Sequence, residues 1–447
     1  MTFSETTQPF ILTSMKLKTV YSCQQCAYQT SKWMGRCPSC EEWNSFLEDV
    51  INVGKTESKN PALHAHPAGK PQNLELSTLP TVRTQTGIGE FDQVLGGGFV
   101  EGSLTLLSGE PGIGKSTLTL QIVERMASQK EKVLYVTGEE SVDQVSDRAK
   151  RLGCTQKNIE LLYENNVENI LLTLESNRPD FLVVDSIQVM ASSEIVGTAG
   201  SISQVRIVTE MLMNTIKTYK IPTLLIGHVN KEGNIAGPKV LEHLVDTVLL
   251  LEGERDHELR MLRATKNRFG AVSEVGLFEM SAKGLEELKN PGQRILENRP
   301  KGTTGTCLTL SMEGQRPLLM EVQALVHQTP FGYPKRMTGG FDRNRLELLL
   351  AVLQKHTSLN FSDQDVYINV TGGLHLSDPA ADLAVCAAIA SSLLKKAVPE
   401  NWVLFGEVGL TGEIRNTTKD DARRKAAKKL GLLVPNAKPQ LKDILRF

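Results

Sequence analysis

Between residues 78 and 285, short apolar runs alternate with segments of helical period. Four of these runs are LTLLS at 104–108, KVLYVTG at 132–138, FLVVDS at 181–186 and TLLIGHV at 223–229. Strands that are buried on both faces are apolar throughout, and helices between them let successive strands run parallel. The pattern therefore predicts an α/β fold in which helices cover a parallel sheet.

After Val245 the apolar runs follow one another without room for crossover helices. They lie at 247–253, 259–270 and 275–280. Parallel neighbours need a long crossover, whereas antiparallel strands can be joined by short turns. We therefore expect antiparallel strands at one edge of the sheet.

A second mixed pattern begins near Gly302 and reaches almost to Phe447. It predicts strands at 306–313, 317–326 and 366–372, and helices at 345–356 and 380–394. We expect an independent α+β domain in this part of the chain.

Segments without apolar periodicity separate these regions. Residues 1–14 are polar, and residues 51–77 are rich in Pro, Gly and Lys. Such compositions are typical of disordered extensions and linkers. The expected organisation is an extension at 1–14, a cysteine-bearing module at 15–50, a linker at 51–77, an α/β domain at 78–285, a linker at 286–301 and an α+β domain at 302–447.

Composition limits the kinds of partner and the compartment. The formal net charge of the 447 residues is -1, so any contact with nucleic acid must come from local basic patches. No run of about 18 apolar residues occurs, and the first residues lack a secretory signal pattern. We therefore expect a cytoplasmic protein.

Four of the seven cysteines form two Cys-x2-Cys pairs separated by ten residues. In a reducing compartment this spacing predicts one tetrahedral Zn²⁺ site, and four thiolates leave no open position for catalysis. We expect Trp33 and Trp43 to pad this module, although an exposed indole would suit contact with a base or a protein partner. The predicted ligands are Cys23, Cys26, Cys37 and Cys40.

The run GEPGIGKST, between an expected strand and an expected helix, satisfies the phosphate-loop pattern G-x4-G-K-[ST]. Its backbone N–H groups can surround the phosphates of ATP, its lysine can reach the β- and γ-phosphates, and its serine can ligate Mg²⁺. The residues are Gly109, Glu110, Pro111, Gly112, Ile113, Gly114, Lys115, Ser116 and Thr117.

Polar residues follow three of the predicted strands, at the edge where the phosphate loop lies. Asp185 ends one strand and is expected to hold Mg²⁺. Glu139 is favoured over Glu140 as the base that activates water. His228 follows another strand, where it either senses the γ-phosphate or is an ordinary strand-end histidine; the sequence leaves both open.

Two polar, glycine-rich segments, after Asp185 and after His228, interrupt the α/β pattern and are expected to be functional loops. Farther along, the run KNRFG places Lys266 and Arg268 at the end of an edge strand. These cations either form a charged turn or act on a neighbouring subunit's nucleotide in the manner of an arginine finger.

The zinc module, the ATPase with KNRFG and the C-terminal domain together resemble the RadA (Sms) family of bacterial DNA repair proteins. The resemblance runs from Met15 almost to the end of the chain. It implies a RecA-like core and a hexameric ring that encircles DNA and drives branch migration beside the RecA recombinase. It also implies that Lys115, Ser116, Asp185 and Glu139 serve ATP and Mg²⁺, while Lys266 and Arg268 serve the neighbour's nucleotide and coupling to DNA.

The C-terminal domain resembles the proteolytic domain of Lon proteases. Ala380 stands at the position of the nucleophilic serine, and Asp421 stands where the general-base lysine would fall. Ser377 is close, but it lies at the wrong position of the turn. Without the serine and the lysine this acyl transfer has no route, so we expect a proteolytically inactive scaffold.

Two basic groups in this domain are either solvated surface or contacts for DNA phosphates. One lies at 419–429, with six basic residues against two acidic ones. The other comprises Lys335, Arg336, Arg343 and Arg345.

Two other function classes stay open at this point. A signalling or scaffold ATPase similar to KaiC would use hydrolysis for timing, but such proteins commonly carry duplicated ATPase domains and this chain has one phosphate loop. An ATP-dependent protease is opposed by Ala380.

Overall fold

The computed structural model describes most of the chain, in several stretches. The described residues are 17–23, 28–39, 41–52, 82–195, 197–228, 240–253, 258–288, 291–330, 332–371, 375–435 and 440–444. The expected extension at 1–14, residues 53–77 of the expected first linker, and the ligand candidates Cys26 and Cys40 lie outside them.

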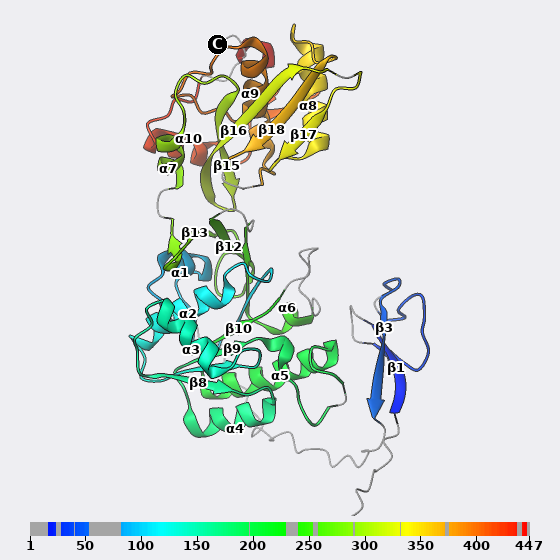
Figure 1. Ribbon diagram of the computed structural model, residues 1–447, viewed down its shortest axis with the longest axis vertical. Helices are drawn as coiled ribbons and strands as arrows, with labels where there is room; N and C mark the ends of the chain where they lie inside the picture. Colours follow the sequence, from blue (N-terminus) through cyan, green and yellow to red (C-terminus); the bar gives the residue numbers. More distant parts are fainter. Residues whose placement is uncertain are drawn as a thin grey trace, which may run out of the picture.

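A nine-stranded sheet forms the centre of the ATPase part, in the order β14-β13-β12-β11-β6-β10-β9-β7-β8 (Figure 1). Its parallel section contains β6 (Leu104–Gly109), β7 (Val133–Thr137), β8 (Ile159–Tyr163), β9 (Phe181–Asp185), β10 (Thr223–Ile226) and β11 (Thr247–Glu252). All residues of β6, β7, β9 and β10 are buried, which agrees with their continuous apolar runs. The sequence pattern missed β8, a half-exposed edge strand without such a run.

Three strands extend this sheet in the antiparallel sense. The close spacing of the apolar runs predicted two of them, at 259–270 and 275–280, but not the third, at 284–287. They are β12 (Leu259–Asn267), β13 (Val275–Ser281) and β14 (Gly284–Glu287). Strand β11 joins the two sections, because it pairs in parallel with β6 and antiparallel with β12.

Helices cover both faces of the sheet, because successive strand residues point to opposite sides. Leu107 and Val183 pack with α1 (Gly89–Leu95), α2 (Lys115–Ala127) and α3 (Val142–Arg151). Leu106 and Val184 pack on the other face, which is covered by α4 (Val167–Asn177), α5 (Ile202–Tyr219) and α6 (Val240–Leu244). The short elements β4 (Arg83–Thr84), β5 (Phe99–Val100) and η1 (Ile187–Val189) complete this part.

The C-terminal part is an α+β domain around a four-stranded sheet of order β15-β16-β18-β17. Its strands are β15 (Thr306–Glu313), β16 (Arg316–Gln328), β17 (Arg336–Gly339) and β18 (Gln364–Val370). The remaining elements are α8 (Arg343–His356), η2 (Pro379–Ala381), α9 (Asp382–Leu394), β19 (Glu407–Val408), β20 (Ile414–Arg415), α10 (Asp420–Lys429) and α11 (Leu441–Ile444). Residues of α8 and α9 join one hydrophobic cluster and residues of α10 join another.

The segment 286–301, expected to be a linker, contains regular structure. It includes the end of β14 and the helix α7 (Pro291–Asn298), whose Ile295 and Leu296 pack against the cluster that contains Leu319. The helix was missed because its apolar positions are too few to set a period.

Direct contacts join the ATPase part to the C-terminal domain. The backbone N–H of Gln315, in the β15–β16 turn, donates to the carbonyl of Ser273 at 2.8 Å. Next to it, Arg316 forms an ion pair with Glu90 at 2.5 Å. The turn between β15 and β16 therefore rests on the ATPase part.

The cysteine-bearing module is a three-stranded sheet of order β2-β1-β3. Its strands are β1 (Leu17–Cys23), β2 (Gln29–Thr30) and β3 (Phe46–Asn52). Within the part of the chain that the structure describes, no helix has the length and apolar character needed to cross a membrane.

Candidate functional site

The phosphate loop connects β6 to α2 at the carboxyl edge of the parallel strands. Gly114, immediately before α2, has φ of 114°, and a Cβ there would lie 2.6 Å from Cε of Met280. The positive φ favours glycine, whereas the end of the Met280 side chain could move to admit a Cβ. The loop therefore presents its backbone at the first turn of α2, where N–H groups without helical partners can bind phosphate.

Lys115 lies inside this loop and is almost completely buried. Its Nζ donates to the carbonyls of Gly109 at 2.8 Å and Glu110 at 3.0 Å. Burial lowers the pKa of Lys115 to about 8, while the charges of Asp185 and Glu139 act in the opposite direction. A buried ammonium that faces the concave side of the loop suits the phosphates of ATP.

Asp185 lies at the end of β9, two strands away from β6. Tyr135 donates its hydroxyl to Oδ2 of Asp185 at 2.6 Å. Burial raises the pKa of Asp185, and hydrogen bonds from Tyr135 and Ser116 oppose this rise. Because the hydroxyl of Ser116 is near enough to lower the pKa of this carboxylate, the pair fits the oxygen ligands that Mg²⁺ requires.

Glu139 follows β7, and its Oε1 accepts hydrogen bonds from Oγ of Ser186 and from Nε2 of His228, the latter at 3.3 Å. The hydrogen bond from His228 is the main cause that lowers the pKa of Glu139. By contrast, Oε1 of Glu140 pairs with Nη2 of Arg148 at 2.7 Å. The arrangement favours Glu139 as the residue that faces the nucleotide.

Ser186 was missed by sequence reasoning. Its only signal was its position directly after Asp185, at the end of the same strand. Since serines are common after strands, this position alone does not point to a site. The peptide that joins Asp185 to Ser186 is cis.

The KNRFG run lies at the opposite end of the sheet from the phosphate loop. Asn267 pairs with Thr247, which pairs with Thr105 near the start of β6, whereas Gly109 at the end of β6 pairs with Leu251. Four residues of strand separate these ends by about 13 Å along the sheet. The cations of KNRFG and the phosphate loop of one subunit therefore do not meet on one nucleotide.

Each cation of KNRFG has partners in its own subunit. Nζ of Lys266 donates to the carbonyls of Glu242 at 2.5 Å and Val245 at 2.8 Å, at the end of α6. Burial lowers the pKa of Lys266. Arg268 pairs with Asp246 at 3.0 Å, and its side chain remains 50% exposed. Of the two, Arg268 is the more accessible to a neighbouring molecule.

In the cysteine-bearing module, Cys23 and Cys37 are buried in one cluster with Phe46. They come from the two different Cys-x2-Cys pairs. The N–H of Cys23 donates to the carbonyl of Tyr28 at 2.9 Å, and the N–H of Glu41 donates to the carbonyl of Cys37 at 2.9 Å. The shared burial of Cys23 and Cys37 fits a Zn²⁺ site with these two residues among its ligands.

The tryptophans of this module do not pad it. The side chains of Trp33 and Trp43 are 55% and 67% exposed. The expectation of packing was wrong because Phe46 and the partly buried Tyr21 and Met34 already pack against Cys23 and Cys37.

The position that corresponds to the Lon nucleophile is not accessible to solvent. Ala380 is completely buried, Ser377 is exposed, and Asp421 is exposed on the first turn of α10. Arg423 fills the neighbouring space and binds Asp378 at 2.5 Å. A buried ion pair therefore stands beside the position of the nucleophile.

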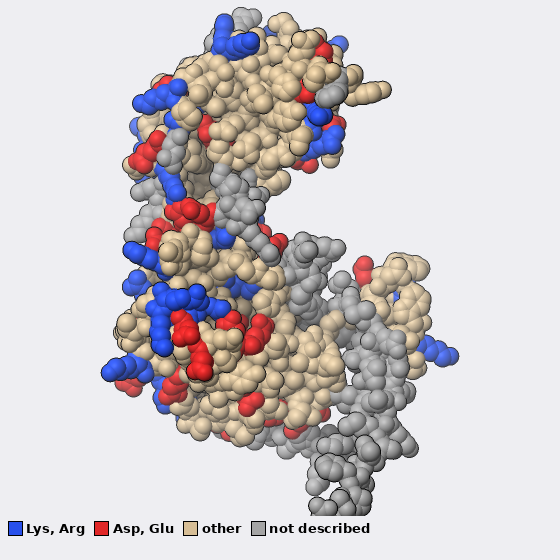
Figure 2. Space-filling view, in the orientation of Figure 1, with Lys and Arg blue, Asp and Glu red and all other residues tan. Residues whose placement is uncertain are grey.

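Several residues of the two basic groups are not available to DNA. Arg423 is buried, and Arg345 forms a bidentate pair with Asp382. The guanidinium of Arg336 donates to the carbonyls of Phe361 and Gln364. Figure 2 shows Lys and Arg side chains interspersed with Asp and Glu on the visible face. The exposed cations of α10 are Arg424, Lys425, Lys428 and Lys429.

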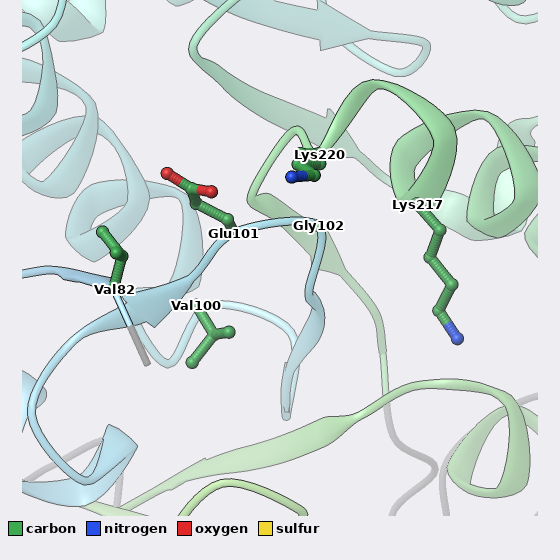
Figure 3. Close-up of a pocket in the computed structure, with 6 residues that line it drawn as sticks. All are labelled: Val82, Val100, Glu101, Gly102, Lys217 and Lys220. Atoms are coloured by element: carbon green, nitrogen blue, oxygen red, sulfur yellow. The ribbon is translucent and has the colours of Figure 1, made fainter. Parts of the chain in front are cut away.

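A hollow of about 370 Å³ lies near the start of β6, away from the phosphate loop (Figure 3). In Figure 3 the side chain of Lys217 projects away from Glu101 and Lys220. The hollow shares no residue with the nucleotide site. Its lining residues are Val82, Val100, Glu101, Gly102, Lys217 and Lys220.

Two family models match parts of the chain. The KaiC ATPase model matches residues 84–167, and the rubredoxin metal binding domain model matches residues 21–48. A solved structure, that of a KaiC-like protein from Pyrococcus horikoshii, is 24% identical, covers 47% of this chain and all of its own, and has a TM-score of 0.41.

Relatives in three bacteria match almost the whole chain, and each is named DNA repair protein RadA. The protein of Bacillus subtilis is 47% identical over 94% of this chain and 93% of its own. The protein of Streptococcus pyogenes is 48% identical, and that of Listeria monocytogenes 44%, each over 93% of this chain and 91% of its own. The chain therefore belongs to the RadA family of DNA repair proteins.

Proposed function

We propose that the chain is an ATP-driven motor that binds single-stranded or branched DNA and promotes branch migration of recombination intermediates during repair. The observation that carries this proposal is the division of the catalytic groups between two ends of one sheet. Lys115, Asp185 and Glu139 gather at one end, and the KNRFG run lies at the other. A second copy is needed to bring both sets to one nucleotide.

Within one subunit, each group has a distinct task. The N–H groups of the phosphate loop and Nζ of Lys115 hold the phosphates. Ser116 and Asp185 would hold Mg²⁺, which offsets the charge that develops on the γ-phosphate. Glu139 uses Oε1 to accept from Ser186 and His228, which leaves Oε2 to take the proton of the attacking water.

The neighbouring subunit supplies the remaining charge. Arg268 is half exposed and can leave Asp246 for a neighbour's γ-phosphate, where an arginine finger stabilises the transition state. Lys266 would assist it. Head-to-tail contacts of this kind close into rings, and we propose a hexamer that encircles DNA and works with the RecA recombinase.

The decisive test measures ATP turnover with and without single-stranded DNA. Wild type should be stimulated by DNA, and Lys115→Ala should abolish turnover. Glu139→Gln should lower kcat about 100-fold or more, whereas the matched Glu140→Gln should retain most activity. Turnover that ignores DNA in wild type would refute the motor.

A mixing experiment tests the division between subunits. Lys115→Ala and Arg268→Ala are each expected to be inactive alone. Mixed in equal amounts, they form some interfaces that pair an intact phosphate loop with an intact arginine, so partial activity should return. Absence of recovery in mixed rings that assemble normally would show that Arg268 does not act across the interface. Branch migration would then be assayed directly on a labelled four-way junction.

A second candidate function is that of a timing ATPase, which the match of the KaiC model to residues 84–167 favours. Such a protein would hydrolyse ATP at the same rate with and without DNA, so the first experiment separates the two. Proteolysis is opposed by the buried Ala380, and casein degradation measures it directly.

A further inference from the structure

The carboxylate of Glu139 is held by two side chains that act on one of its oxygens. Oγ of Ser186 donates a short hydrogen bond to Oε1, and Nε2 of His228 lies 3.3 Å from the same atom. Since a carboxylate only accepts, Nε2 of His228 carries the proton in this contact. The other oxygen, Oε2, has neither of these contacts.

The three residues come from three neighbouring strands. Glu139 follows β7, Ser186 follows β9 and His228 follows β10, and these strands are adjacent in the sheet. Their register brings the strand ends level, because Thr137 pairs with Asp185. The contact is therefore built at the aligned ends of three neighbouring strands.

Burial distinguishes Ser186 from the other two. Ser186 is completely buried, whereas the side chains of Glu139 and His228 are partly exposed. A buried hydroxyl that reaches Glu139 from inside the sheet can fix the carboxylate but cannot touch the substrate. The side chain of His228, which contacts the same oxygen, is 31% exposed.

We propose that Ser186 is a positioning residue for the base, and that with His228 it aims Oε2 of Glu139 at the attacking water. This inference rests on the proposed ATPase function. Loss of the Ser186 hydroxyl leaves His228 as the only described side chain that hydrogen-bonds Oε1. The long side chain of Glu139 would then sample several rotamers, and a displacement of about 1 Å can cost 100-fold in rate.

The substitution Ser186→Ala tests this role. We expect kcat for ATP to fall roughly 10- to 100-fold, while KM for ATP and the affinity for DNA change less than about twofold. Ser311→Ala is the matched control, because Ser311 is also completely buried and its hydroxyl has no hydrogen-bond partner among the described residues. It should behave as wild type.

A double substitution separates positioning from a general structural effect. If Ser186 acts only through Glu139, then Ser186→Ala combined with Glu139→Gln should turn over as slowly as Glu139→Gln alone. A further loss in the double variant, or a kcat of Ser186→Ala equal to wild type, would overturn the proposal.

Ser186→Cys keeps the size of the side chain with a weaker donor and should have an intermediate kcat. If Ser186→Ala fails to bind nucleotide, Ser186→Cys tests the positioning role instead. In that case, a kcat of Ser186→Cys equal to that of wild type overturns the proposal. Failure of the proposed function has a different signature, since the turnover of wild type would then be the same with and without single-stranded DNA.

Discussion

Replacing Arg423 by alanine should strongly destabilise the C-terminal domain. Its guanidinium is 1% exposed and binds Oδ2 of Asp378 at 2.5 Å. Its Nε also donates to the carbonyl of Leu310 at 2.9 Å, and its Nη1 donates to Oγ1 of Thr417 at 3.0 Å. These contacts join β15, η2 and α10 around a single buried cation.

Alanine would leave the carboxylate of Asp378 without its counter-charge in a largely buried place. Breaking a buried ion pair by removing one partner typically costs about 3–5 kcal/mol. For a domain of about 150 residues, each kcal/mol shifts the melting temperature by ~2–4 °C, so the transition should fall by roughly 6–20 °C. Calorimetry of the full chain, with hydrogen exchange of residues 306–313 to identify the transition, measures this shift.

Arg424→Ala is the matched control. Arg424 lies on the same helix, and its guanidinium is also 5.8 Å from the ring of Phe405, but it is exposed. Its loss should change stability by less than about 0.5 kcal/mol. Asp378→Asn added to Arg423→Ala should recover part of the loss, because the unpaired charge is gone. Equal melting temperatures for the two arginine variants would refute the reasoning.

Three further predictions follow from single sites. The pKa of Lys115 is lowered to about 8, so at about pH 9 most of its side chains are neutral and must regain a proton when ATP binds. The affinity for ATP should therefore fall by up to about tenfold per pH unit above pH 8. Equal Kd values at about pH 7 and pH 9 would contradict this. A Cβ at Gly314 would lie 1.7 Å from a backbone oxygen of the β12–β13 connection. Gly314→Ala should therefore loosen the contact between the ATPase part and the C-terminal domain and speed hydrogen exchange in the β15–β16 turn. Gly332→Ala should not, because Gly332 has open space around it. Cys37→Ser should abolish stoichiometric binding of Zn²⁺, measured by a chromophoric chelator, whereas Cys307→Ser should retain the metal.

Local patterns in the sequence predicted much of the fold and the nucleotide site. The apolar runs that became β6, β7, β9 and β10 were recognisable because a strand buried on both faces has few polar positions. The phosphate loop was recognisable because its chemistry depends on spacing within one turn between a strand and a helix. In both cases the information lies within a few consecutive residues.

Elements with weak local patterns were missed. Strand β8 contains only exposed and half-buried residues at the sheet edge, and α7 has few apolar positions. Both owe their stability to neighbours that are distant in sequence, so their own residues carry little signal.

Only the tertiary structure decided which residues meet. The register of β6, β11 and β12 puts Arg268 and the phosphate loop at opposite ends of the sheet, although both belong to the same domain. Of the cations in 419–429, the structure buries Arg423 and leaves Arg424 exposed, although the two are consecutive. Ser186 is a candidate positioning residue only because the ends of β7, β9 and β10 lie side by side in the sheet. The physical reason is that a residue's type and spacing determine its local conformation, whereas its burial and its partners depend on packing between segments that are far apart along the chain.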